Sequence, residues 1–336
     1  MTNKVTDKNA LNLIRFLAAF HVLIGHTQGH LKVNFLPRLF SDAFGILQGV
    51  PVFFILSGFL IWNSIGRTKD LKTFCQKRVF RLYPELWMGV AINFIVIVIL
   101  FFKKIRWIPF LAFQATQSTF LQFWTPSFLR EYGVGTPNGS LATIGVMLQA
   151  YIVMWFLFKL LHGKSAKVWA VANVCCVALS FTPQVLKLFL PEILVKLFNQ
   201  TFVPYLFLFV LGMTLCEFFS KLIVFLKKFW YVFAVLALAV VFFNFDVVTT
   251  YGILKSYFIA PAIIGFAYSF PKLSFKNDYS YGIYIYHMIV INVLIHFGFA
   301  GQFWTIPAVI LLSLLLAMAS YHSIGVLSRR KRETLK

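Results

Sequence analysis

The sequence predicts an all-α integral membrane protein with about ten transmembrane helices. Of its 336 residues, 60% are hydrophobic and only 12% are charged, whereas an ordinary soluble domain is roughly 45–50% apolar and about 25% charged. Many apolar residues fall in runs of about 20, the length that crosses a bilayer as a helix. Short clusters of Lys and Arg separate these runs. A disordered chain, a disulfide-rich secreted scaffold and most soluble enzymes are therefore excluded.

Each long apolar run is expected to form one membrane-spanning helix. No linker rich in Gly or Ser divides the chain, and no internal repeat of the transporter kind stands out. We therefore expect one polytopic membrane domain over residues 1–336. The expected spans cover residues 10–29, 44–65, 84–102, 140–161, 168–186, 202–219, 229–246, 252–270, 280–298 and 305–327.

The distribution of basic residues predicts that both chain ends lie in the cytoplasm. With the N-terminus inside, 21 of the 31 Lys and Arg residues fall on cytoplasmic segments and nine on external ones. The positive-inside rule favours this orientation, against the external cluster Lys103–Arg106. The net charge of +21 is then mainly a topology signal, so we expect a multi-pass protein of the cell membrane and no nucleic-acid partner. The cytoplasmic or inner membrane of a bacterium is the expected location.

Three ionisable residues, Arg15, His21 and His26, interrupt the first apolar run, where such groups are costly and ask for a reason. Arg15 and His26 are eleven residues apart, which places them on one face of a helix. Spacing alone leaves two interpretations open. Either both contribute to a site in the membrane, or Arg15 extends to the inner interface and His26 caps the outer helix end.

Further motifs extend this pattern along the chain. The motifs are Arg15 with His26, the run Val52–Leu60 (VFFILSGFL), Arg78-Val79-Phe80-Arg81 with Leu82-Tyr83-Pro84, and Ser280–His287 (SYGIYIYH). Together, and in this order, they resemble the acyltransferase-3 family of integral membrane acyltransferases, over essentially the whole chain.

The resemblance implies an O-acyltransferase that moves an acyl group, usually acetyl, from cytoplasmic acyl-CoA to a hydroxyl of a cell-surface or lipid-linked glycan. By motif, His26 matches the essential histidine and Arg15 its partner, while Arg78 and Arg81 match the pair associated with the acyl-CoA phosphates. The chain resembles the stand-alone form, without an extracytoplasmic hydrolase-like domain. Acetyl-CoA is the expected donor, and no metal site is indicated.

The residues themselves support these roles. The segment from Arg67 to Arg81, which is expected to form a loop, holds six cations and one anion, Asp70. This balance suits phosphates and also a purely topological role. His26 is expected to act as general base toward the glycan hydroxyl, with an acyl-histidine intermediate as the alternative. Candidates to stabilise the charge that develops on the carbonyl oxygen are Ser57, Arg15 and His287.

The other predicted contacts each have a plain structural interpretation. Ser57 is expected near the acyl donor, although Ser57-Gly58 also suits close helix packing. His287, Tyr151 and Asp42 are expected near the acceptor; a buried hydrogen bond to a neighbouring helix is the alternative for His287, and a helix cap the alternative for Asp42.

The fourth span departs from the family pattern. Ala142 stands where Trp is expected, Met147 where Glu is expected, and Ala150 where Phe is expected, while Thr143, Ile144 and Tyr151 fit. The loss of the Glu removes a carboxylate that would orient or charge-stabilise the histidine. Asp42 or Gln149 are possible substitutes.

Two rival functions follow from these departures and from the membrane location. One is a transporter or exporter of a glycan or small acid, with Arg15 as its anion contact. The other is a catalytically silent relative, because Met147 replaces the family Glu. The transporter interpretation leaves the Arg78 and Arg81 pair unexplained.

Overall fold

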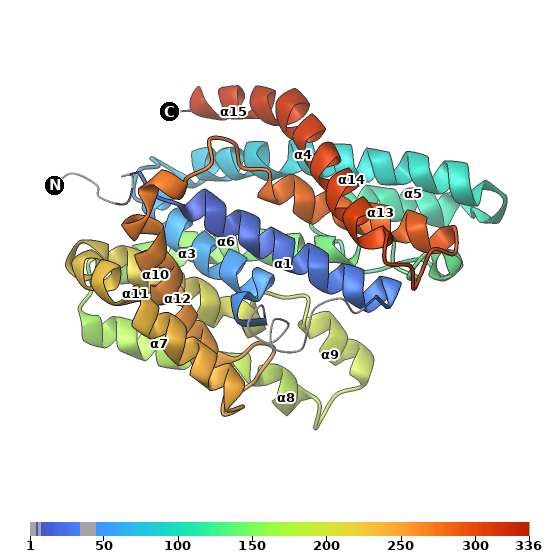
Figure 1. Ribbon diagram of the computed structural model, residues 1–336. Helices are drawn as coiled ribbons and strands as arrows, with labels where there is room; N and C mark the ends of the chain where they lie inside the picture. Colours follow the sequence, from blue (N-terminus) through green and yellow to red (C-terminus); the bar gives the residue numbers. More distant parts are fainter. Residues whose placement is uncertain (1–4, 6–7, 34–44, 336) are drawn as a thin grey trace. The chain divides into compact units, whose positions relative to one another are not determined.

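The computed structural model describes residues 5, 8–33 and 45–335, and its regular structure is helical. Figure 1 shows the helices along the chain. Their bounds are α1 Leu11–Leu31, α3 Gly49–Ile65, α4 Leu71–Phe101, α5 Trp107–Gln117, α6 Ala142–Leu161, α7 Ala166–Ser180, α8 Thr182–Leu186, α9 Glu192–Phe198, α10 Leu206–Glu217, α11 Phe219–Phe242, α12 Ile253–Ser269, α13 Ser280–His296, α14 Thr305–Ser320 and α15 Val326–Glu333.

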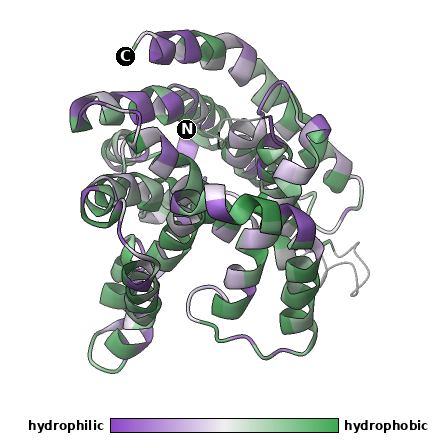
Figure 2. Cartoon of the chain, turned by 90° about the vertical axis from the view of Figure 1, so that its left-hand side faces the viewer, coloured by the Kyte–Doolittle hydropathy of each residue, from purple (hydrophilic) through white to green (hydrophobic). Residues whose placement is uncertain are grey.

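The helices confirm the predicted all-α membrane fold. Within the described chain, five segments are long and apolar enough to cross a membrane: 71–104, 139–161, 166–186, 219–242 and 305–333. A sixth joins α9 to residues 203–217 across a 58° bend, and α3, α12 and α13 are shorter apolar helices. With α1, these segments account for about ten spans, each about as long as a bilayer crossing needs. Figure 2 shows that α15, which carries the C-terminus, is mostly hydrophilic.

Helix α4 begins well before the span expected at 84–102. Asp70 caps its N-terminus, where the carboxylate accepts a hydrogen bond from the backbone N–H of Thr73 at 2.9 Å. This bond, followed by the one from the Thr73 hydroxyl, holds the pKa of Asp70 below its usual value. The expectation of a loop up to Arg81 was therefore wrong, because the helix capped by Asp70 begins before the start of the apolar run. Arg78 and Arg81 consequently lie on a helix.

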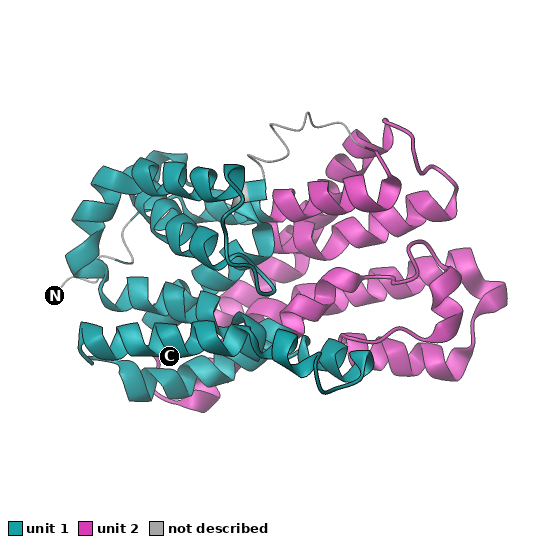
Figure 3. Cartoon of the chain, turned by 90° about the horizontal axis from the view of Figure 1, so that it is seen from below, with its two compact units in different colours: residues 1–18, 37–67, 146–278 teal, residues 19–36, 68–145, 279–336 magenta. Residues whose placement is uncertain are grey.

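The chain divides into two compact units, residues 1–18, 37–67 and 146–278, and residues 19–36, 68–145 and 279–336 (Figure 3). In the first unit, α10 is buried along most of its length and packs on α3, α7 and α12. A Cβ on Gly58 of α3 would lie 2.1 Å from the Phe209 carbonyl oxygen, and one on Gly212 2.0 Å from the Ile55 carbonyl oxygen. The close-packing interpretation of Gly58 is thus confirmed.

In the second unit, α13 is the buried helix, and it packs on α4 and α14. The loop at 133–140 is tied to it. The Asn292 side chain accepts from the backbone N–H of Val134 at 2.8 Å, and the Asn138 side chain donates to the Ile285 carbonyl at 2.8 Å. Gly133 has φ +56°, and a Cβ there would lie 1.9 Å from Asn292 Oδ1, so only glycine fits. This loop fixes the position of Ser140, which lies in the short 3-10 helix immediately before α6.

Candidate active site

The structure brings together two of the histidines singled out in the sequence. His26 on α1 and His287 on α13 are 261 residues apart in the chain, yet His26 Nδ1 lies 2.9 Å from His287 Nε2. His287 is fully buried, whereas His26 is half-buried. His287 Nδ1 lies 3.0 Å from the carbonyl oxygen of Ile283, one turn earlier on the same helix. The predicted interhelical hydrogen bond of His287 is therefore present.

Hydroxyl groups adjoin this histidine pair. Ser140 Oγ lies 3.2 Å from His287 Nε2 and 3.5 Å from His26 Nδ1. The Ser140 carbonyl in turn accepts from the Thr143 hydroxyl at 2.9 Å and from the Tyr284 hydroxyl at 3.0 Å. The Thr143 and Tyr284 hydroxyl oxygens also contact each other, so one of the two hydroxyls shares its proton between this contact and the Ser140 carbonyl. The backbone of Ser140 is thus held by polar contacts from α6 and α13, next to the histidine pair.

Arg15 makes a contact that the sequence did not reveal. Its guanidinium Nη1 lies 3.0 Å from Asp278 Oδ2, and the side chains are 18% and 16% exposed. Asp278 is two residues before the start of α13 at Ser280. The pair therefore ties α1 to the segment that leads into the helix of His287. The catalytic role predicted for Arg15 stays a prediction.

Ser57 and Tyr151 meet at Met147, where the family pattern has Glu. The Ser57 hydroxyl donates to Met147 Sδ at 3.4 Å, and the Tyr151 hydroxyl donates to the same sulfur at 3.5 Å. A thioether is a weak acceptor, so neither hydroxyl is strongly held. The predicted roles of Ser57 at the acyl donor and of Tyr151 at the acceptor stay predictions. Asp42, the third candidate near the acceptor, lies outside the described residues.

Arg78 and Arg81 stand three residues apart on α4, so their side chains leave neighbouring positions of one helix surface. Both are half-buried, and the Arg78 guanidinium lies 5.3 Å from the centre of the Phe74 ring. A guanidinium held against an aromatic face keeps its N–H groups in a defined plane. Such an arrangement suits phosphate binding, since a planar fork of donors matches phosphate oxygens.

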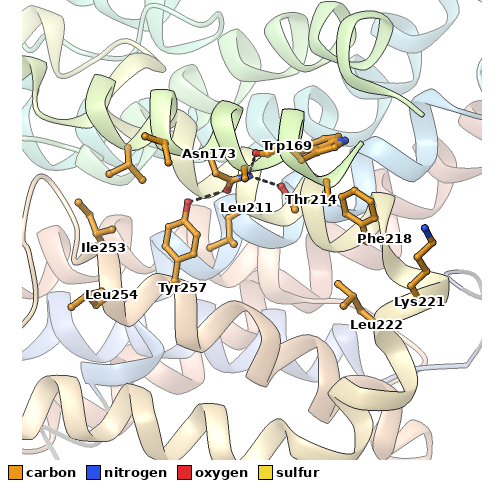
Figure 4. A pocket seen from close by; sticks show the side chains of 14 residues that line it. Trp169, Asn173, Leu211, Thr214, Phe218, Lys221, Leu222, Ile253, Leu254 and Tyr257 are labelled. Atoms are coloured by element: carbon orange, nitrogen blue, oxygen red, sulfur yellow. Dashed lines mark hydrogen bonds between the residues drawn. The ribbon is translucent and has the colours of Figure 1, made fainter. Parts of the chain in front are cut away.

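The first unit also contains a cavity of about 760 Å³ between α7, α10, α11 and α12. The Asn173 side chain donates to the Trp169 carbonyl and to Thr214, and it accepts from the Tyr257 hydroxyl (Figure 4). The amide is therefore satisfied within the protein, and the remaining wall is chiefly apolar. None of the predicted site residues lines this cavity.

Sequence reasoning missed Ser140, Asp278 and the Ile283 carbonyl. Ser140 lies in the short 3-10 helix Gly139–Leu141, which is too short to show a periodic sequence pattern. A backbone carbonyl leaves no signature in a sequence. A signal for Asp278 was present in the sequence. An arginine inside an apolar run favours an acidic partner, and Asp278 is one of only ten acidic residues in the chain. Within the described residues, no three His, Cys, Asp or Glu side chains are grouped so that they would hold a metal ion.

Comparison with known proteins identifies relatives across the chain. Residues 8–322 match a family described as an acyltransferase domain. Nodulation protein 10 of Rhizobium leguminosarum bv. viciae is 25% identical over 323 residues, which cover 88% of this chain and 86% of that protein. Peptidoglycan O-acetyltransferase OatA of Listeria monocytogenes serovar 1/2a is 29% identical over 139 residues, 38% of this chain and 22% of the relative. No solved structure matches the chain.

Proposed function

We propose, from the premise that this chain belongs to the acyltransferase-3 family of membrane acyltransferases, that it moves an acetyl group from acetyl-CoA to a hydroxyl of a cell-surface or lipid-linked glycan. The glycan acceptor is supported by the name of one relative, a peptidoglycan O-acetyltransferase. The proposed acyl donor is acetyl-CoA, because its phosphates carry negative charge that the basic pair Arg78 and Arg81 on α4 can bind. The apolar helices and the family support a multi-pass membrane location, and the membrane that we propose is the cytoplasmic membrane of a bacterium.

The observation that carries this proposal is the half-buried imidazole of His26, held at one ring nitrogen by the fully buried His287. His26 takes the proton of the glycan hydroxyl while its oxygen attacks the thioester carbonyl. A carbon–oxygen bond forms, the carbon–sulfur bond breaks, and the thiolate of CoA leaves with the electron pair and then takes up a proton. The products are the acetylated glycan and free CoA.

The acyl donor approaches from the cytoplasmic side in this proposal. Arg78 and Arg81 belong to the first half of α4, which the charge distribution assigns to the cytoplasm. They bind the phosphates of CoA through paired N–H donors. The pantetheine arm is long, thin and largely uncharged, so it carries the thioester into the membrane region while the nucleotide stays in the cytoplasm.

Reconstitution of the purified protein in lipid vesicles tests the proposal. Radiolabelled acetyl-CoA is supplied together with cell-envelope glycan, including peptidoglycan, and both label transfer and CoA release are measured. General bases contribute about 10²- to 10⁴-fold, so we expect His26→Ala to lower transfer by at least about 100-fold.

The matched control is His296→Ala, which removes an exposed histidine at the end of α13 and is expected to keep transfer. Transfer that persists in His26→Ala would refute the assignment of the base. A wild-type protein that transfers no label and releases no CoA would refute the enzymatic function and favour a silent relative.

A further inference from the structure

We infer that His287 is the positioning residue of the proposed reaction: through its hydrogen bond to His26 it fixes the tautomer of that ring, so that Nε2 of His26 is the basic nitrogen. The inference rests on the proposed function and deepens it. The juxtaposition behind it is a row of three groups, the Ile283 carbonyl, the His287 ring and the His26 ring, joined by contacts of 3.0 and 2.9 Å. All three lie in the same compact unit.

The first step assigns the proton on His287. The Ile283 carbonyl oxygen is an acceptor only, so the contact of 3.0 Å requires a proton on His287 Nδ1. His287 is fully buried, and its hydrogen-bond partners include Ile283, Ser140 and His26, none of which is a carboxylate. A charged imidazolium is disfavoured in such a place. The ring is therefore neutral and its Nε2 carries a lone pair.

The second step assigns the proton on His26. Two nitrogens 2.9 Å apart require one proton between them, because two facing lone pairs repel. Since His287 Nε2 is the acceptor, His26 Nδ1 is the donor. A path through the Ser140 hydroxyl gives the same answer: that group accepts from His26 and donates to His287. In the neutral His26 ring, the lone pair is thus left on Nε2.

This assignment gives the proposed base a defined direction. Within the described residues, no hydrogen bond of the protein joins His26 Nε2, and the side chain is only half-buried, so this nitrogen is available to an acceptor hydroxyl. When Nε2 takes the proton, the bond from Nδ1 to His287 becomes charge-assisted and stabilises the imidazolium. The carboxylate that orients a catalytic histidine elsewhere is replaced here by a second imidazole.

Other titratable groups also face His26. His30 lies one turn further along α1, and its ring centre is 5.5 Å from that of His26. His21 lies on the same helix and interacts electrostatically with His26. His287 faces it from α13. Among these three, the pair with His287 is the one in which two ring nitrogens approach to hydrogen-bond distance, so the orientation of the His26 ring depends on His287.

The test compares two substitutions of His287 in the full-length protein in vesicles. His287→Gln keeps an amide oxygen near the position of Nε2, which accepts from His26 Nδ1–H, whereas His287→Leu removes every acceptor. We expect His287→Leu to lower kcat by about 100-fold with the KM for acetyl-CoA within about twofold of wild type. We expect His287→Gln to recover kcat to within about tenfold of wild type. His296→Leu, the same change on the same helix, is the matched control.

A double variant separates positioning from general support of the fold. If His287 acts only through His26, His287→Leu adds no further loss in a protein that already carries His26→Ala. A further loss in that background, an equal loss in both His287 variants, or a change confined to KM would overturn the inference. Wild-type kcat in His287→Leu alongside lost transfer in His26→Ala would overturn the inference and leave the proposed function standing. Retained transfer in His26→Ala would instead refute the assignment of His26 as the base, and with it the proposed function of this site.

Discussion

Neutralising one member of the Arg15–Asp278 pair is expected to destabilise the protein and lower transfer, and neutralising both is expected to restore much of each. Arg15 Nη1 and Asp278 Oδ2 are 3.0 Å apart, and both side chains are largely buried. At an effective dielectric constant of about 20, unit charges about 4 Å apart attract by about 4 kcal/mol. Partial exposure and desolvation reduce this, so each single variant should lose about 2 kcal/mol of unfolding free energy.

The variants are Arg15→Met, Asp278→Asn and the two combined. Unfolding free energies come from titration of SDS into mixed micelles, and transfer is measured with the same preparations in vesicles. We expect the double variant to lose only about 1 kcal/mol relative to wild type, which is about 3 kcal/mol less than the sum of the two single losses. Losses that add to within about 0.5 kcal/mol would refute the pairing. A double variant that regains stability and stays inactive would show that Arg15 acts on the reactants directly.

Two further predictions concern α4 and α3. Exchange of Arg78 and Arg81 for Ala should raise the KM for acetyl-CoA by about tenfold or more. Exchange of both for Lys should give a smaller rise, because Lys keeps the positive charge but lacks the paired N–H donors of Arg. An unchanged KM in transfer assays would leave only a topological role. Gly58→Ala should cost about 1–3 kcal/mol in SDS titration, since its Cβ would lie 2.1 Å from the Phe209 carbonyl oxygen. Gly29→Ala, whose Cβ would meet no heavy atom of the described residues within 4 Å, is the control and should be neutral or stabilising; equal effects would contradict the packing argument.

Hydropathy predicted the spans well because a bilayer imposes one requirement on every crossing segment, a run of apolar residues of fixed length. The ends of helices follow other rules. α4 begins at Leu71, far ahead of its apolar run, because Asp70 and Thr73 form an N-terminal cap and several of the following residues, all of them Leu, Lys, Gln or Arg, are good helix formers. The apolar run locates the part of a helix that faces lipid, and the capping residues locate its beginning.

The sequence identified individual residues of the candidate site, but it did not predict which of them contact one another. Arg15, His26 and His287 each stood out as an ionisable group in an apolar run. Their partners did not follow from spacing, because contacts over 261 and 263 residues depend on how the helices pack and rotate. Motif order brought all three into one hypothesis, yet it gave no indication that Arg15 pairs with Asp278 while His26 pairs with His287.

The departure at the fourth span also changes meaning once these contacts are known. Met147 receives two hydroxyl donors, from Ser57 at 3.4 Å and Tyr151 at 3.5 Å. A Glu side chain at this position would receive the same donors as stronger, charge-assisted bonds. The setting for a carboxylate is thus retained although the carboxylate is absent. If His26 is oriented by His287, the reaction does not depend on that carboxylate for the tautomer of its base, and Met147 by itself is not a reason to expect an inactive protein.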